Sequence, residues 1–172
     1  KLRTPLVGRE RERSLLSDAL DRARSEQSAQ IVTIVGVPGI GKSRLAAEVA
    51  DQAAAQGWRL LSAGCVDLAE GSVPYLALVD ALRTFTPAEL PPALNHWRRG
   101  EVEPAASELS PDAARGRVYA AYLDLLRTRS DEAPVALVVE DVHWADRATR
   151  DMLSYLIRGL GAPQFQARVV VL

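Results

Sequence analysis

Short apolar runs alternate along the chain with longer segments in which apolar residues recur every three or four positions. Runs of strand length occupy 31–35, 58–65, 135–139 and 167–172. Helical spacing of apolar residues is found over 15–23, 42–56, 76–82, 114–125 and 152–160. Strands that alternate with helices need right-handed crossovers, which place the strands parallel in one sheet. The pattern therefore predicts an α/β fold of three layers, with helices on both faces of a parallel sheet.

The region between the second and third strands is predicted to be mainly helical. One helix follows Pro74, and another begins at the capping sequence Ser110-Pro111-Asp112. Residues 86–109 are rich in Pro, Ala and Glu, and no ordered element is predicted for them. We therefore expect a helical insert between the second and third strands.

Capping residues mark where helices begin and end. Asp146 is placed to cap the last helix, and Gly57 is placed to end the helix at 42–56. The chain stops on the apolar run Val169–Leu172, where a loop and a helix are expected to follow a strand. We expect residues 1–172 to form one domain of a longer multidomain protein, truncated at its C-terminus.

The composition and net charge argue against nucleic acid and membranes as binding partners. The chain has 172 residues, a net charge of −1 and one cysteine, Cys65. The near-zero net charge provides no excess of positive charge to attract nucleic acid, so no DNA binding by this chain is expected. A single cysteine excludes an internal disulfide and fits a reducing cytoplasm. Because no apolar run approaches the length of a membrane span, a cytoplasmic location without membrane contact is expected.

The strongest chemical signal is the stretch Gly36–Ser43, G-V-P-G-I-G-K-S, directly after the first apolar run. It fits the phosphate-binding loop G-x-x-x-x-G-K-[ST], in which glycines let backbone N–H groups turn inward around a phosphate. Lys42 is predicted to reach the β- and γ-phosphates and act in catalysis, and the Ser43 hydroxyl to ligate Mg²⁺. The following helix offers its N-terminus to the same anion, so a P-loop NTPase fold is predicted. The predicted nucleotide contacts here are Gly36, Pro38, Gly39, Ile40, Gly41, Lys42, Ser43 and Arg44.

The other half of the site is predicted at the end of the third apolar run. Glu140 and Asp141 follow that run, and ligands of open parallel sheets lie beyond the carboxyl ends of the strands. If the strand at 135–140 lies beside the strand at 31–35, both acids face the phosphates. One would then hold Mg²⁺, directly or through water, and the other would orient the attacking water. A solvated acidic pair at the start of a loop is the alternative.

Two ring side chains follow the acidic pair. His143 could reach the γ-phosphate or a neighbouring subunit, or could be structural at a helix start, and we assign it no catalytic role. Trp144 is expected to pack in the interior, as are Trp58 and Trp97.

Three strings together resemble a known family: Leu6–Glu10 (L-V-G-R-E), Gly36–Ser43, and Leu137–Asp146 (L-V-V-E-D-V-H-W-A-D). They are similar to the AAA-like ATPase domain of the large ATP-binding LuxR-family transcriptional regulators, within the STAND class of signal-transduction ATPases. The resemblance implies a switch that ADP holds closed and that ATP with an inducer opens. A distant C-terminal helix-turn-helix then binds promoter DNA.

The resemblance also implies site residues and cofactors. ATP or ADP with Mg²⁺ would be bound, and Glu140 with Asp141 would form the acidic pair. Many of these ATPases have Asp where Glu140 stands, which leaves open which acid touches the metal. The residues implied to lie against the adenine are Val7, Gly8 and Arg9.

Two other functions fit the same loop. A small P-loop kinase would need a lid that carries arginines. The candidate arginines lie along the solvent-exposed face of an amphipathic helix: Arg115, Arg117, Arg127 and Arg129. A non-catalytic interaction module would keep the nucleotide as a structural ligand. The function predicted first is a slowly hydrolysing regulatory ATPase. Its expected partners are nucleotide, the remaining domains of the same protein and, in the ATP state, further copies of itself.

Overall fold

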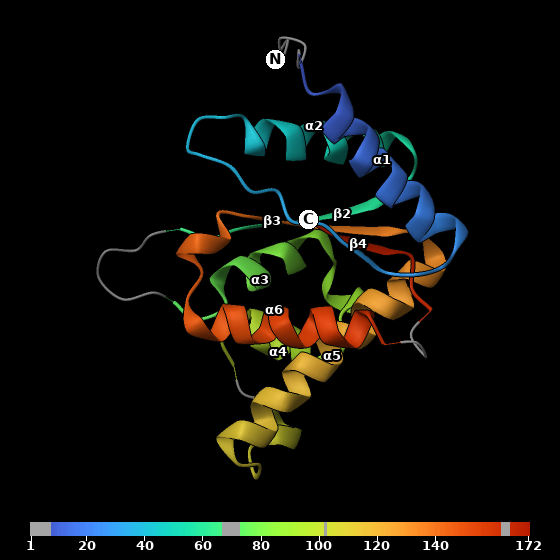
Figure 1. Ribbon diagram of the computed structural model, residues 1–172. Coiled ribbons are helices and arrows are strands. Elements are labelled where there is room, and N and C mark those ends of the chain that lie inside the picture. The colour runs from blue at the N-terminus through green and yellow to red at the C-terminus, as the bar shows by residue number, and fades with distance from the viewer. Residues whose placement is uncertain (1–7, 67–72, 102, 163–165) are drawn as a thin grey trace.

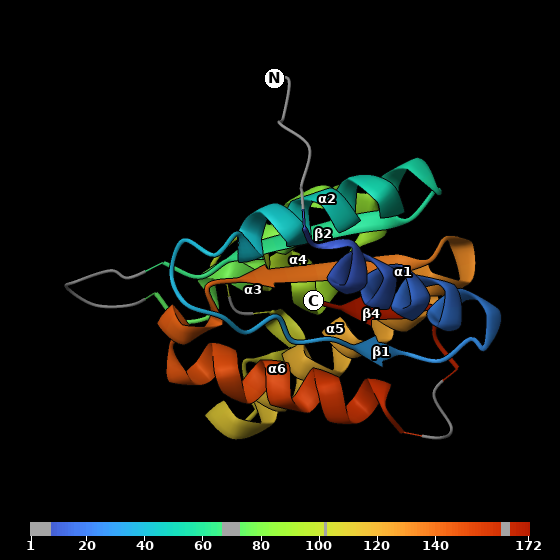
Figure 2. The same cartoon turned by 45° about the horizontal axis from the view of Figure 1, so that its top comes forward.

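The parallel sheet at the centre of the fold is seen in a computed structural model that describes residues 8–66, 73–101, 103–162 and 166–172. Its strand order is β1-β4-β3-β2, and every neighbouring pair is parallel. The strands are β1 Gln30–Ile31, β2 Arg59–Gly64, β3 Val135–Glu140 and β4 Val169–Val171. Helices cover both faces of the sheet (Figures 1 and 2), which confirms the predicted three-layer α/β fold.

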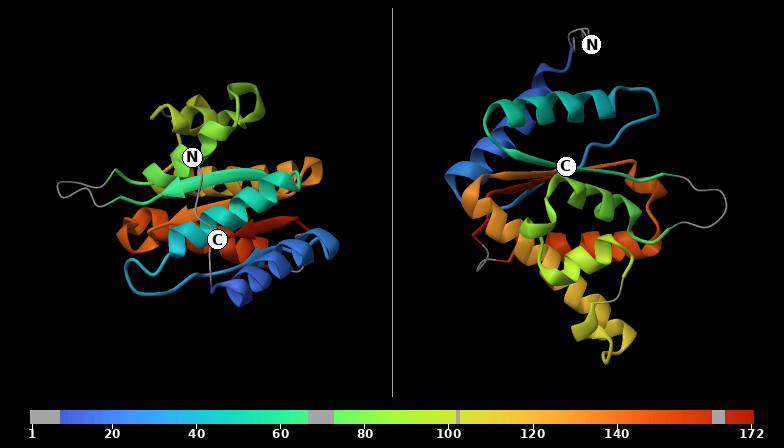
Figure 3. Two further views of the ribbon diagram at one scale, coloured as in Figure 1. Left: turned by 90° about the horizontal axis from the view of Figure 1, so that it is seen from above. Right: turned by 180° about the vertical axis from the view of Figure 1, so that it is seen from behind.

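Alternate residues of the central strands point into different layers. Helices α1 (Glu10–Ser25) and α2 (Lys42–Ala55) pack over Ala136 and Val170 on one face (Figure 3). The other face carries the strand residues Val135, Leu137, Val139, Val169 and Val171. They share a core with α3 Leu76–Ala81, α4 Pro92–Arg98, α5 Pro111–Glu132 and α6 Arg147–Leu160. None of the helices in the described ranges combines the length and hydrophobicity that a membrane span requires.

Helix ends lie where the capping residues predict them. Ser110 and Asp146 each accept a hydrogen bond from the backbone N–H three residues later, at the starts of α5 and α6. Gly57 follows the end of α2 with a φ of +81°, and its N–H donates to the carbonyl of Ala54 over 3.0 Å. Glycine suits this position because an L side chain is strained there. These boundaries are therefore decided by local chemistry.

The insert between β2 and β3 is helical, as predicted, but it is more ordered than expected. The stretch 86–109 contains α4, and its 3-10 turns are Pro87–Glu89 and Pro104–Ala106; a further 3-10 turn, Leu82–Thr84, continues α3. Proline begins all three elements within 86–109, and its fixed φ and missing N–H cost nothing at a first helical position. Leu94 of α4 is fully buried in the core. The prediction of no ordered element was wrong because these prolines start helical turns that tertiary packing then holds.

The first strand is shorter than predicted and has a different neighbour. Only Gln30 and Ile31 pair with β4, and the N–H of Val32 adds one hydrogen bond to the carbonyl of Val171 at 2.9 Å. Val35 is 87% exposed, so the end of the predicted strand runs beyond the sheet. Because β4 lies between β1 and β3, the expectation that 135–140 would lie beside 31–35 was wrong. An apolar run predicts a strand but specifies neither its burial nor its neighbour in the sheet, since Ile31 and Val35 are both exposed.

The cap of α6 gives a first prediction. Burial raises the pKa of Asp146, but hydrogen bonds from Thr149 and Tyr75 outweigh burial, and the pKa lies below its ordinary value of 3.8. A pKa lowered by folding means that the carboxylate stabilises the protein above the unfolded-state pKa, and that this stability is lost as pH falls through the folded-state pKa. We expect Asp146→Ala to lower the free energy of unfolding by about 1–2 kcal/mol at pH 7.

Urea unfolding of both proteins at pH 7 and pH 3 checks this expectation. The stability difference should shrink at pH 3, because this pH lies below the ordinary aspartate pKa of 3.8 and toward the lowered folded-state pKa. Asp146→Asn is the matched control, because its amide can still cap the helix but does not titrate. A stability difference that is the same at both pH values would contradict the assignment of the charged form to the cap.

Candidate functional site

The loop between β1 and α2 turns sharply at two glycines. Gly39 and Gly41 have φ values of +78° and +97°, a region that L side chains rarely adopt. The N–H of Ile40 donates to the carbonyl of Val37 over 3.3 Å and closes the turn. At Gly36, an added Cβ would come within 3.0 Å of the Ile40 side chain. The loop backbone therefore requires glycine at 39 and 41, whereas a Cβ at Gly36 would need the Ile40 side chain to move.

The loop leads into a helix start that no side chain caps. Gly41 is the N-cap of α2 and has no side chain with which to accept a hydrogen bond. The first N–H groups of a helix lack partners within the helix, and together with the helix dipole they favour an anion. The Lys42 ammonium lies over the same loop, where it donates to the carbonyls of Gly36 at 2.9 Å and Val37 at 3.2 Å. Positive charge and unpaired donors thus gather at one place.

Arg9 ties the start of α1 to this loop. Its guanidinium donates to the carbonyl of Ile40 over 3.0 Å and to the carboxylate of Glu12 over 2.8 Å. Gly8 precedes it with a φ of +77°. Of the three residues implied to contact adenine, Arg9 therefore contacts the loop, Gly8 directly precedes Arg9 in the chain, and Val7 lies outside the described residues.

The acidic pair lies at the carboxyl end of β3. Glu140 ends the strand and is partly buried, and Asp141 is exposed. Asp141 has φ +55° and ψ +40°, a left-handed conformation that is uncommon for a residue other than glycine. The chain then enters a 3-10 turn, Val142–Trp144, whose last N–H donates to the Asp141 carbonyl over 2.8 Å. Backbone strain of this kind persists only where the surrounding structure holds the residue in place, and it is often found at functional sites.

One cavity joins the loop and the acidic pair. Its volume is about 750 Å³, within the range of roughly 300–1,000 Å³ usual for ligand sites. The predicted site residues that line it are Gly36, Pro38, Lys42, Ser43, Glu140 and Asp141. Apolar residues of 31–35, β3 and α6 form much of the remaining wall. Both halves of the predicted site therefore face one space, although β4 separates their strands.

The residues around the cavity fit a magnesium nucleotide. Mg²⁺ in proteins is typically held by one or two carboxylates together with substrate phosphates and water. Glu140, Asp141 and the exposed hydroxyl of Ser43 could supply such oxygen ligands. The loop and Lys42 could neutralise the phosphates. Six of the predicted site residues that the structure describes do not line the cavity: Gly8, Arg9, Gly39, Ile40, Gly41 and Arg44. Gly41 and Arg44 nevertheless flank the open start of α2.

Two polar residues of α6 that line the cavity were not predicted as site residues. Arg150 and Ser154 lie one helical turn apart on α6 and line the cavity with the acidic pair. Arg150 brings a second cation close to the site. The available signal was its position four residues after the Asp146 cap, on the polar face of α6.

The rings after the acidic pair lie at the surface. His143 lines the cavity, and its ring lies 5.0 Å from that of Trp144. Trp144 is 48% exposed, so the expectation that it packs in the interior was wrong. Trp58 is buried and Trp97 packs against the core, as expected. The 3-10 turn explains the difference, because it turns the chain away from the sheet directly after β3.

Comparison with known proteins identifies a family and a relative. A family model described as AAA ATPase domain matches residues 5–172, which include the loop and the acidic pair. The chain is also 28% identical over 177 residues to the uncharacterized protein R02095 of Rhizobium meliloti (strain 1021). That match covers 90% of this chain and 17% of the relative, so the chain spans a small part of the relative's length.

The backbone of Asp141 yields a second prediction. A left-handed residue costs roughly 1–2 kcal/mol for most side chains, less for Asp, and nothing for Gly. We therefore expect Asp141→Gly to be more stable than Asp141→Ala by about 1 kcal/mol, measured by chemical denaturation. Glu140 has extended backbone in β3, so the order should reverse there, with Glu140→Ala more stable than Glu140→Gly. The same order at both positions would contradict the left-handed geometry of Asp141.

Proposed function

The chain belongs to the AAA ATPase domain family, and from this premise we propose that it binds ATP with Mg²⁺ and hydrolyses it slowly as the regulatory module of a larger protein. The observation that carries the proposal is the single cavity lined by the phosphate loop and the acidic pair. A loop without carboxylates could only bind a nucleotide, whereas hydrolysis also needs a held metal and a positioned water.

The residues of the site have separate roles in this proposal. The unpaired N–H groups at the start of α2 and the Lys42 ammonium bind the phosphates. The Ser43 hydroxyl and one carboxylate of the acidic pair hold Mg²⁺, which neutralises charge on the phosphates when bound. The other carboxylate accepts a hydrogen bond from the attacking water and orients it. Gly8 and Arg9 contact the base side of the nucleotide, and Arg9 also fixes the loop through Ile40.

The larger protein is proposed to be a LuxR-family transcriptional regulator of the STAND class. In this proposal residues 1–172 are its ATPase domain, and nucleotide state controls a DNA-binding domain elsewhere in the protein. The string Glu140-Asp141-Val142-His143-Trp144-Ala145-Asp146 supports this assignment, since it is more specific than the loop. The small share of the Rhizobium relative that this chain spans also fits a module within a long protein.

The arginines of α5 give little support to the kinase alternative. Arg115 is paired with Asp112, Arg127 with Asp124, and Arg129 with Glu132. Arg117 is paired with Glu103 at 2.8 Å. None of these four arginines lines the cavity that the phosphate loop borders. A phosphoryl-transfer lid would have to bring such cations over the phosphates, so hydrolysis is the better supported reaction.

Removal of the Lys42 ammonium tests nucleotide binding. We expect Lys42→Ala to weaken ATP binding at least about tenfold, because a charged donor to the phosphates is lost. Calorimetric titration of Mg-ATP at 25 °C measures this effect. Arg83→Ala is the control, since Arg83 is an exposed cation of the insert whose partner is Asp80. Equal affinities in both variants and the native chain would contradict the assignment of the loop.

The acidic pair is tested by separating binding from turnover. In Glu140→Gln and Asp141→Asn, we expect phosphate release to fall at least about tenfold in one or both variants, because metal or water is no longer held. ATP binding without Mg²⁺ should change by less than about twofold. Unchanged phosphate release in both variants would exclude a role for the pair.

The same assays separate the alternatives. Native protein that binds ATP and releases no phosphate would favour the non-catalytic module. Transfer of phosphate to nucleosides or small alcohols that outpaces hydrolysis would favour the kinase.

A further inference from the structure

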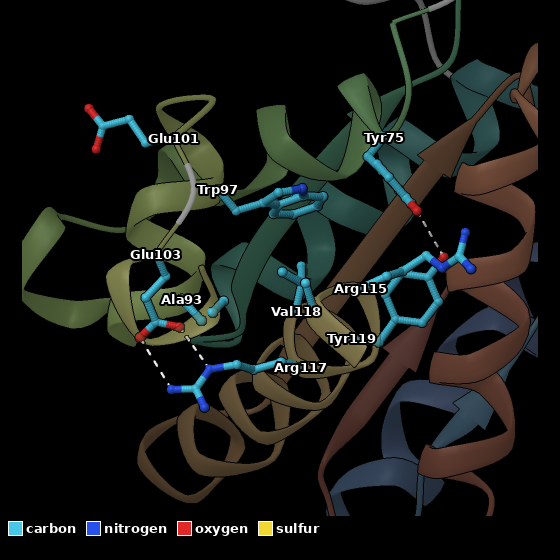
Figure 4. Close-up of a pocket in the computed structure, with 11 residues that line it drawn as sticks. Tyr75, Ala93, Trp97, Glu101, Glu103, Arg115, Arg117, Val118 and Tyr119 are labelled. Atoms are coloured by element: carbon cyan, nitrogen blue, oxygen red, sulfur yellow. Dashed lines mark hydrogen bonds and ion pairs between the residues drawn. The ribbon is translucent and has the colours of Figure 1, made fainter. Parts of the chain in front are cut away.

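A second cavity lies in the helical insert, apart from the candidate nucleotide site. Its volume is about 210 Å³, and its wall comes from α4, α5, the residue before α3, and Glu101, Glu103 and Ala106 of the segment between α4 and α5 (Figure 4). The rings of Tyr75, Trp97 and Tyr119 and the side chain of Val118 form its apolar part. An apolar cavity of about 150 Å³ accommodates benzene, so this one has room for a molecule of two fused rings.

The rings are fixed by one another. Tyr75 meets Trp97 edge to face with centroids 5.5 Å apart, and it meets Tyr119 in the same manner at 6.1 Å. Aromatic pairs favour this geometry because the positive edge of one ring meets the negative face of another. A planar guest could contact the same rings by the same interactions.

Two residues of the cavity wall, Tyr75 and Tyr119, carry hydroxyl groups. The Tyr119 hydroxyl donates to the carbonyl of Ala148 over 3.3 Å and lies 3.1 Å from the Tyr75 hydroxyl. Either hydroxyl can be the donor between the two tyrosines. The Tyr75 oxygen has two lone pairs, so in both arrangements it keeps at least one with which it can accept a further hydrogen bond.

Charged residues at the rim have partners within the protein. Glu103 is bound by Arg117 through two hydrogen bonds of 2.8 and 3.3 Å (Figure 4). Arg115 pairs with Asp112, and Glu101 pairs with Arg99. A charged guest would have to displace one of these pairs, whereas a neutral guest would not.

We propose that this cavity binds a neutral, planar molecule of two fused rings with one N–H or O–H donor, and that its occupancy is transmitted to the nucleotide site. The donor binds the Tyr75 oxygen, and the rings lie among Trp97, Val118 and Tyr119.

The first turns of α6 provide the connection. The backbone N–H of Tyr75 donates to the Thr149 hydroxyl at 3.1 Å and to the Asp146 carboxylate at 3.3 Å, and Tyr119 is bound to Ala148. The next turns of the same helix supply Arg150 and Ser154 to the nucleotide cavity. If Tyr75 and Tyr119 shift when the guest binds, α6 shifts with them through these hydrogen bonds, and α6 lines the nucleotide cavity. This transmission rests on the proposed function, whereas the binding site itself does not.

Indole is the first probe, because it has two fused rings and one N–H donor. Titration of the ¹⁵N-labelled 172-residue chain should give saturable chemical-shift changes at Tyr75, the Trp97 side chain and Val118. Benzothiophene, which has the same shape but no donor, should bind more weakly. Tyr75→Phe should weaken indole binding about fivefold and leave benzothiophene binding unchanged. No saturable change at the insert, or equal small changes at all aromatic residues, would overturn the site.

Filling the cavity tests its location. Val118→Phe should weaken the binding of both probes at least about tenfold, because the added ring occupies the space of the guest. Leu15→Phe is the control, since Leu15 is 58% exposed on α1, and α1 lies on the face of the sheet opposite the insert (Figure 1). Undiminished indole binding by folded Val118→Phe would overturn the proposal, and Tyr75→Phe decides the matter if Val118→Phe does not fold.

Calorimetry with ATP tests the transmission. Saturating indole should change the ATP dissociation constant at least about fivefold, and ATP should change that of indole by the same factor, because coupling is reciprocal. Equal ATP affinity with and without indole would overturn the transmission. If the native chain did not bind ATP at all, the proposed function would fail, while the indole titration would still decide the binding site.

Discussion

The candidate site depends on a geometric constraint of parallel sheets, in which all carboxyl ends lie along the same edge. The loop after β1 and the acidic pair after β3 come from segments about 100 residues apart, and yet they face one cavity. Unpaired backbone donors at the start of α2 supply the positive side of this cavity, and two carboxylates supply the negative side. Charge separation of this kind suits a phosphate with a bound cation, because each group meets its complement.

Part of the local backbone strain lies at the same edge, while Gln27 and Tyr75 have positive φ elsewhere in the fold. Gly39, Gly41 and Asp141 all have left-handed backbone within the two segments that border the cavity. Glycine relieves the strain in the loop, but Asp141 retains it, which is consistent with a residue kept for its carboxylate. Stability and proposed function therefore compete at this position.

The start of α6 connects the sheet to the insert. Thr149 is buried, and its hydroxyl and the Asp146 carboxylate accept from the Tyr75 N–H, which lacks a helical partner at the start of α3. A buried polar group without such partners would be costly, so these contacts fix the insert in relation to the strand that ends in the acidic pair. The aromatic cavity and the nucleotide cavity are thereby joined through one helix. This arrangement could not be read from spacing alone, since Tyr75 and Asp146 are 71 residues apart.

The sequence by itself determined the features that depend on neighbouring residues. Gly36–Ser43 predicts a loop because only glycine tolerates its turns, and Ser110 and Asp146 predict helix starts because their side chains reach N–H groups three residues away. Tertiary structure alone decided that β4 lies between β1 and β3, that α4 forms within 86–109, that Trp144 is exposed and that Arg150 faces the site. Strand pairing and the packing of one element on another join residues that are distant in sequence, so no local pattern could specify them.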